Sequence, residues 1–227
     1  PEGRFVNELI VPLHRSLAGE EGARKTPMPA LPRSTSRDRV WLFAKVYCSR
    51  LEADRFLGET ILPLVDNLRG RRLIERWHFV RYADPEPHIR LRLRGDRRKL
   101  YRRALPYLIE NLQKPDTAFP LMAFDTYVPE YIRYGGREGL DVAERIFEVD
   151  SWAATGLINR HSGDEEARWR LALLGVHTFL EAFDWDIDSR IQFLDAIVQH
   201  QRERRKGAPL ERELGRKFRN MRPAIEN

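Results

Sequence analysis

The sequence has little that would cross-link the chain or anchor it in a membrane. Cys48 is the single cysteine among 227 residues, which excludes an internal disulfide framework and a cysteine-rich metal site. No apolar run approaches the roughly 18 residues that a membrane-spanning helix needs. The first residues also lack the charged-then-apolar pattern of a signal peptide. We therefore expect a soluble, cytoplasmic protein.

Several common catalytic motifs are missing as well. The sequence contains no Gly-x-Ser-x-Gly elbow, no Walker phosphate loop and no Gly-x-Gly-x-x-Gly turn, so serine hydrolases, P-loop NTPases and Rossmann enzymes lose their usual support. None of the six histidines forms a convincing metal-binding pair on a helix face. We expect neither a metal site nor a cofactor.

Charge is unevenly distributed along a chain whose net charge is +6. Residues 69–105 hold 13 Lys and Arg against 4 Asp and Glu, and residues 200–222 hold 9 against 3. Residues 116–195 hold 7 against 16. Such basic stretches suit an anionic partner, but they also suit solvated surfaces. Because no nucleic-acid-binding motif accompanies them, we interpret them as solvated surfaces and expect no direct nucleic-acid partner.

The hydrophobic periodicity predicts an α+β fold, with a mainly antiparallel sheet flanked by helices and a helix-rich C-terminal half. Residues 1–39 are expected to be an N-terminal extension and linker, and residues 40–227 the domain. Strands are predicted at 41–47, 77–82, 88–94 and 124–128. Helices are predicted at 51–68, 97–113, 138–158, 165–183, 187–206 and 210–222.

The segment 88–94 is the most informative of these strands. Side chains alternate between the two faces of a strand, so its three aliphatic residues share one face, toward the core. The other face receives four basic side chains, His88, Arg90, Arg92 and Arg94. Arginine captures carboxylate or phosphate through paired N–H groups. The sequence leaves two interpretations open: an anion-binding face, or a face neutralised by acidic neighbours and water.

Two further features stand near this strand. Arg81, between bulky neighbours in the preceding strand, either has a buried partner or extends to solvent. The segment 125–136 carries three tyrosines, Arg133 and a glycine pair, which fits a pocket wall but also ordinary packing.

Residues 41–48, 77–92, 126–136 and 143–151, in this order and spacing, resemble the C-terminal domain of lantibiotic dehydratases. That domain is also called the thiopeptide-type bacteriocin biosynthesis domain. The resemblance covers about residues 40–222 and includes the Arg-Tyr-Gly-Gly motif at 133–136.

The resemblance implies a function. Full-length members glutamylate Ser and Thr of a precursor peptide in a large N-terminal domain, and the C-terminal domain then eliminates glutamate to leave dehydroalanine or dehydrobutyrine. Stand-alone members instead build the pyridine ring of thiopeptides by a formal [4+2] cycloaddition. A non-catalytic module that binds the peptide or a partner is the remaining alternative. The implied partners are a precursor peptide, a separate glutamylating dehydratase and a second copy in a homodimer.

The resemblance also nominates residues. The catalytic candidates by motif are Arg81, Arg90 and Arg133. Arg92 shares the strand face with Arg90, and we add His88 as a proton-transfer group from its place on that face. The further candidates for substrate contact are Tyr82, Tyr127 and Tyr134. Two differences from the family pattern keep the alternatives open: Ile132 stands where Glu often precedes the motif, and residues 215–222 contain no histidine.

Overall fold

The computed structural model describes residues 39–112, 121–204, 215–216, 218–220 and 222, and the chain divides into two compact units between Arg168 and Trp169. Except for Arg39, the predicted extension lies outside the described residues, so the boundary at 39/40 stays a prediction. Most of the helix predicted at 210–222 also lies outside them.

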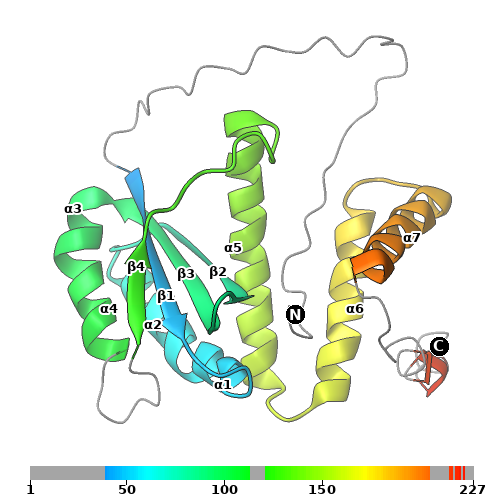
Figure 1. The fold of residues 1–227 in the computed structure, drawn as a ribbon, viewed down its shortest axis with the longest axis horizontal. Helices are drawn as coiled ribbons and strands as arrows, with labels where there is room; N and C mark the ends of the chain where they lie inside the picture. The colour runs from blue at the N-terminus through cyan, green and yellow to red at the C-terminus, as the bar shows by residue number, and fades with distance from the viewer. Residues whose placement is uncertain (1–38, 113–120, 205–214, 217, 221, 223–227) are drawn as a thin grey trace. The chain divides into compact units, whose positions relative to one another are not determined.

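The first unit is built on a four-stranded antiparallel sheet in the order β2-β3-β1-β4 (Figure 1). The strands are β1 (Arg39–Tyr47), β2 (Arg76–Ala83), β3 (Pro87–Asp96) and β4 (Met122–Asp125). Three of them confirm the predicted strands. The fourth begins and ends earlier than predicted: its pairing with β1 stops at Asp125, and the next N–H, of Thr126, donates to the Asp125 side chain at 2.7 Å.

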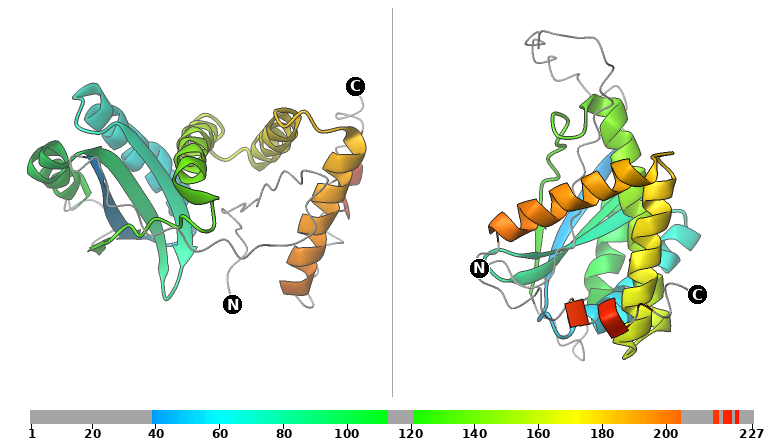
Figure 2. Two further views of the ribbon diagram at one scale, coloured as in Figure 1. Left: turned by 90° about the horizontal axis from the view of Figure 1, so that it is seen from above. Right: turned by 90° about the vertical axis from the view of Figure 1, so that its right-hand side faces the viewer.

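The two faces of β3 differ as the alternation predicts. Ile89, Leu91 and Leu93 are fully buried on one face. Two helical segments cover this face. The first comprises α1 (Ala53–Phe56), η1 (Leu57–Ile61) and α2 (Leu62–Gly70). The second comprises α3 (Arg97–Lys99), η2 (Leu100–Ala104) and α4 (Leu105–Leu112). Seen from above, both lie on the same side of the sheet (Figure 2).

The helices predicted at 51–68 and 97–113 each contain a proline, which the helix accommodates by a wider, π-helical turn. Pro63 and Pro106 each lie at the second residue after a π-helical turn. Proline lacks an N–H and crowds the carbonyl four residues earlier, and a π turn relieves that crowding. The two segments therefore continue through their prolines and keep their apolar stripes on the sheet.

Helix α5 (Gly136–Arg160) runs along the free edge of β2 (Figure 1). The Phe79 N–H, which has no strand partner on that side, donates to the Ser151 hydroxyl at 3.1 Å. The helix thereby covers an edge that would otherwise pair with another chain. It confirms the helix predicted at 138–158 and begins two residues earlier.

The second unit holds most of α6 (Glu165–Glu181) and all of α7 (Ile187–Arg204), which confirms two more predicted helices. Four aromatic rings join them in sequence, with neighbouring centroids 5.0–5.4 Å apart: Phe179, Phe183, Trp185 and Phe193. Asp186 caps α7 by accepting from the Ser189 N–H at 2.8 Å. The fold is α+β, as predicted. In the described part of the chain, no helix is both long enough and apolar enough to cross a membrane.

Candidate functional site

The face of the sheet opposite the helical layer, called here the open face, carries the four basic residues of β3. In the antiparallel register, Lys45 lies opposite Arg90 and Phe43 opposite Arg92 on β1. On β2, Tyr82 lies opposite His88 and His78 opposite Arg92. Side chains directly opposite one another share a face. Four of the eight candidate residues therefore lie together on the open face: Tyr82, His88, Arg90 and Arg92.

Tyr82, His88 and Arg90 form one contact group. The Arg90 guanidinium stacks over the Tyr82 ring, 3.4 Å from its centroid. His88 is 2% exposed and donates from Nδ1 to the Glu86 carbonyl at 2.8 Å, so its Nε2 is the acceptor for Arg90 Nε at 3.3 Å. Burial, with smaller effects of the Arg90 and Lys45 charges, lowers the pKa of His88. His88 is thus neutral at neutral pH, and its one ring lone pair, on Nε2, accepts from Arg90.

Arg92 lies at the centre of a second group. Its guanidinium stands 4.9 Å from the Tyr127 ring centroid and 5.1 Å from that of Phe43. It also donates to Nε2 of His78 at 3.2 Å. His78 is fully buried, and its Nδ1 has no hydrogen-bond partner among the described residues. Burial and the Arg92 charge lower the pKa of His78 to about 3, so the ring stays neutral and accepts from Arg92.

Sequence reasoning missed His78. It has no histidine or carboxylate partner at helical or strand spacing, and only the register brings it to Arg92. The alternation of residues 77–82 could have placed it on the open face, but nothing in the sequence told which cation it would meet.

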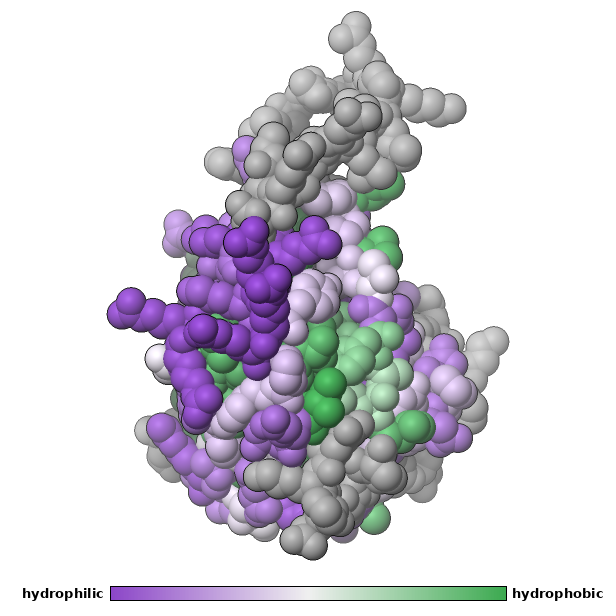
Figure 3. Space-filling view, turned by 90° about the vertical axis from the view of Figure 1, so that its left-hand side faces the viewer, coloured by the Kyte–Doolittle hydropathy of each residue, from purple (hydrophilic) through white to green (hydrophobic). Residues whose placement is uncertain are grey.

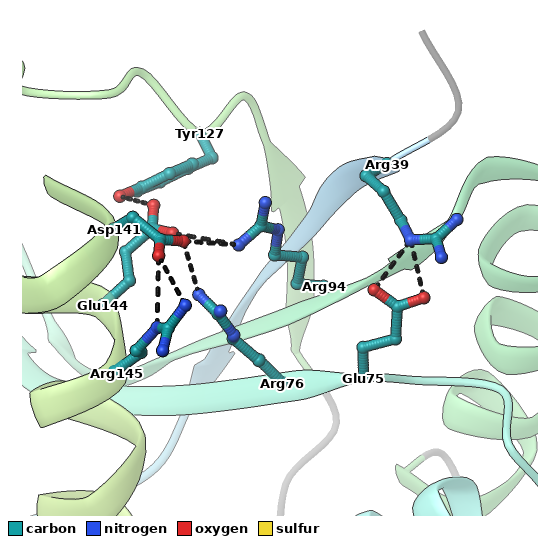
Figure 4. A network of polar contacts seen from close by, with 8 residues as sticks. All are labelled: Arg39, Glu75, Arg76, Arg94, Tyr127, Asp141, Glu144 and Arg145. Carbon is teal, nitrogen blue, oxygen red and sulfur yellow. Dashed lines mark hydrogen bonds and ion pairs between the residues drawn. The ribbon is translucent and has the colours of Figure 1, made fainter. Parts of the chain in front are cut away.

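Tyr127 connects the second group to an acidic network (Figure 4). Its hydroxyl donates to Glu144 at 3.0 Å. Glu144 is 5% exposed, and burial raises its pKa although the Tyr127 hydrogen bond and the Arg94 charge oppose the rise. Burial and the neighbouring Glu144 also raise the pKa of Tyr127.

Arg94, the fourth basic residue of the strand, is neutralised within this network. It lies 3.3 Å from Asp141 and 3.6 Å from Glu144. Arg76 and Arg145 contact the same Asp141 carboxylate at 2.8 and 3.0 Å. Figure 4 also shows a separate pair, Arg39 with Glu75. At this end of the sheet, acidic neighbours neutralise the cations, which is one of the two interpretations that the sequence left open.

Arg81 lies on the other face. The register places it opposite Ile89, so it points toward the helical layer, where it pairs with Asp54. Arg168 contacts the second oxygen of Asp54 at 2.5 Å. Burial alone would raise the pKa of Asp54, but the charges and hydrogen bonds of the two arginines lower it. The structure does not bring Arg81 together with Arg90, and any catalytic role for Arg81 stays a prediction.

Arg133 and Tyr134 lie in the turn before α5. Arg133 contacts Glu130 at 2.9 Å and stands 5.9 Å from the Tyr134 ring centroid. The Tyr134 ring meets Phe147 at 5.6 Å, and Phe147 meets His78 at 5.4 Å. Tyr134 is therefore joined to the Arg92 group through two rings.

Metal binding and catalysis by cysteine have little support in the described residues. They contain no group of three His, Cys, Asp or Glu residues that could hold a metal ion. Cys48 is buried, and burial raises the pKa of its thiol to about 11, which keeps it protonated.

The described domain is an antiparallel sheet with one face buried by helices and the other lined with arginine, tyrosine and histidine. Comparison with known families identifies it further. The family described as lantibiotic biosynthesis dehydratase, C-terminus, matches residues 41–227, and the chain belongs to that family.

Individual proteins are also similar to this chain. The chain is 27% identical over 203 residues to the subtilin biosynthesis protein SpaB of Bacillus subtilis, covering 84% of this chain and 19% of that protein. It is 29% identical over 205 residues to the nisin biosynthesis protein NisB of Lactococcus lactis, covering 85% and 20%. The crystal structure of the tRNA-dependent lantibiotic dehydratase MibB from Microbispora sp. 107891 shares 33% identity over 52% of this chain and 12% of that one, with a TM-score of 0.49. The chain spans about a fifth of the length of these curated relatives.

Proposed function

We propose that this chain eliminates glutamate from glutamylated Ser and Thr residues of a ribosomally made precursor peptide, leaving dehydroalanine or dehydrobutyrine. The open face is the proposed site. Glutamylation is supplied by another protein or by a segment beyond this chain, the reaction takes place in the cytoplasm, and the working form is a homodimer.

The reaction needs two things from the protein. A base removes the Cα proton, the electron pair forms the Cα–Cβ double bond, and the Cβ–O bond breaks to release glutamate as a carboxylate. Cations placed at that carboxylate stabilise the charge as it develops. Arg90 and Arg92 are the proposed anion-binding groups. Neutral His88 is the proposed proton acceptor, through the Nε2 lone pair that Arg90 releases when it turns to the substrate carboxylate.

The observation that carries this proposal is the arrangement of Arg90 and Arg92. They project from one strand onto one face, and each is oriented by a neutral imidazole: His88 for Arg90 and His78 for Arg92. Burial and the adjacent cations lower the pKa of both imidazoles, so both rings are neutral and accept from the arginines instead of repelling them. Family membership supplies the reaction class.

The test uses mass spectrometry of a glutamylated Ser peptide incubated with the 227-residue chain. We expect loss of one glutamic acid and appearance of one dehydro residue. Removing a single group that stabilises a developing oxyanion costs about 10²–10³ in rate, so Arg90→Ala and Arg92→Ala should each slow elimination about 10²-fold. Arg50→Ala, which removes an exposed arginine outside the sheet, is the matched control and should leave the rate unchanged.

A specific observation favours a second candidate, a peptide-binding module without catalysis. Three arginines that the sequence placed among the basic or catalytic candidates have carboxylate partners: Arg81 with Asp54, Arg94 with Asp141, and Arg133 with Glu130. An unchanged mass spectrum, together with peptide binding that Arg92→Ala weakens, would replace the elimination proposal by this one.

A further inference from the structure

A second basic surface lies away from the open face, over two segments: the turn that follows α2, and α3 together with the π turn η2 after it. Its members are the seven exposed cations of these two segments: Arg71, Arg72, Arg97, Arg98, Lys99, Arg102 and Arg103. We call it the α3 surface. Hydrophilic side chains gather on this side of the molecule beside apolar ones (Figure 3). The Lys99 ammonium donates to the Arg72 carbonyl at 3.2 Å, which joins the two segments into one surface.

The cations of the α3 surface lack ion-pair partners in the part of the chain that the structure describes. None of the seven forms an ion pair with a carboxylate of the described residues. Two of the nearby acids are engaged elsewhere: Glu75 pairs with Arg39, and Asp96 caps α3 by accepting from the Lys99 N–H at 2.9 Å. A third, Glu110, lies beside Arg71 and Arg103 without an ion pair to either among the described residues. This contrasts with Arg76 and Arg94 on the sheet, which share the Asp141 carboxylate. Seven cations without an ion pair in the described ranges concentrate positive potential on one exposed surface.

Aromatic groups lie among these cations. Tyr101 is 47% exposed between Lys99 and Arg102. The Arg71 guanidinium lies over the Tyr107 ring, 4.9 Å from its centroid. Arg71, Arg103 and Tyr107 also line an open hollow of about 470 Å³, with Glu110 at its wall. Arginine interleaved with exposed tyrosine is typical of surfaces that contact a phosphate backbone and stack on bases.

We propose that the α3 surface binds the phosphodiester backbone of a nucleic acid. Two observations favour this partner over an acidic polypeptide. The cations form two rows along residues 97–103, Arg98 with Arg102 and Lys99 with Arg103, each pair one helical turn apart. The exposed Tyr101 ring lies in the same stretch, where a base can stack on it. This inference revises the expectation that the basic stretches are merely solvated.

The test measures binding of the 227-residue chain to a short fluorescent RNA hairpin by anisotropy as a function of salt. Contacts to about six phosphates predict that affinity falls about 10³-fold between about 50 and 200 mM salt. The triple variant Arg98→Glu, Arg102→Glu and Arg103→Glu should weaken binding more than about tenfold and reduce the steepness of the salt dependence by about 3.

The matched control reverses the same number of exposed arginines elsewhere: Arg50→Glu, Arg137→Glu and Arg160→Glu. It changes net charge equally, so equal weakening by both triples would overturn the proposal in favour of general electrostatic attraction. Absence of RNA binding at low salt, or tighter binding to polyglutamate than to RNA, would also overturn it. A duplex DNA of the same sequence tells whether the ribose contributes. Thermal unfolding of both triples checks that each remains folded.

Discussion

Leu91 and Arg92 are chain neighbours on opposite faces of the central strand β3, so replacing each tests the assignment of the two faces. Leu91 is fully buried between Ala44 and Phe79 on the adjacent strands and beneath the helical layer. Leu91→Ala removes a buried branched side chain and leaves a cavity that a central strand cannot close. We expect a loss of about 3 kcal/mol in the free energy of unfolding.

Arg92→Ala acts on the other face. It removes two cation–π contacts, with Phe43 and Tyr127, each worth about 0.5–1 kcal/mol, so stability should fall by about 1 kcal/mol. Peptide binding should weaken, whereas Leu91→Ala should leave the affinity of the folded protein unchanged.

Urea unfolding followed by tryptophan fluorescence measures both effects. With a denaturant slope of about 2 kcal/mol/M, the Leu91→Ala midpoint should fall by about 1.5 M. Leu51→Ala is the control, because Leu51 is 96% exposed and its loss should change stability by less than about 0.5 kcal/mol. If Leu91→Ala costs less than about 1 kcal/mol, or no more than Leu51→Ala, the assignment of the buried face is wrong.

Two further predictions concern His78 and the glycines of α5. The folded-state pKa of His78 is about 3, below its unfolded value of 6.5, so the unfolded state binds the proton first. The contribution of His78 to the free energy of unfolding is therefore fully present above about pH 6.5 and falls by roughly 1 kcal/mol per pH unit toward about pH 3. Urea midpoints at several pH values should show this slope, and His78→Gln should reduce it. A Cβ on Gly139 would lie 1.8 Å from the Tyr134 carbonyl oxygen, whereas one on Gly156 would meet nothing within 4 Å. Gly139→Ala should therefore lower the thermal midpoint by disrupting the turn before α5, and Gly156→Ala should stabilise the helix by about 0.5–1 kcal/mol; equal effects would contradict this reasoning.

The local patterns were sufficient to predict most elements of the first unit. Residues 88–94 alternate so regularly that both faces of β3 followed from period two alone. The helices at 51–68 and 97–113 followed from their apolar spacing, and they continue through Pro63 and Pro106 because each is preceded by a π turn. Strand β4 shows the limit, since its pairing with β1 ends at Asp125, three residues before the predicted end.

The sequence by itself therefore determined the fold class, the buried strand face, the family and the line of basic residues on β3. Only the tertiary structure decided which arginines of β2 and β3 share the open face and which partners each one has. Ala83 pairs with Pro87, and this register places Arg81 opposite Ile89, among the helices, while Arg90 and Arg92 remain on the open face. A register shift of one residue would exchange the two faces of β2. The observed register is set by the three residues that connect β2 to β3 and by the packing of α5 against β2. Neither follows from the residue pattern of one strand alone.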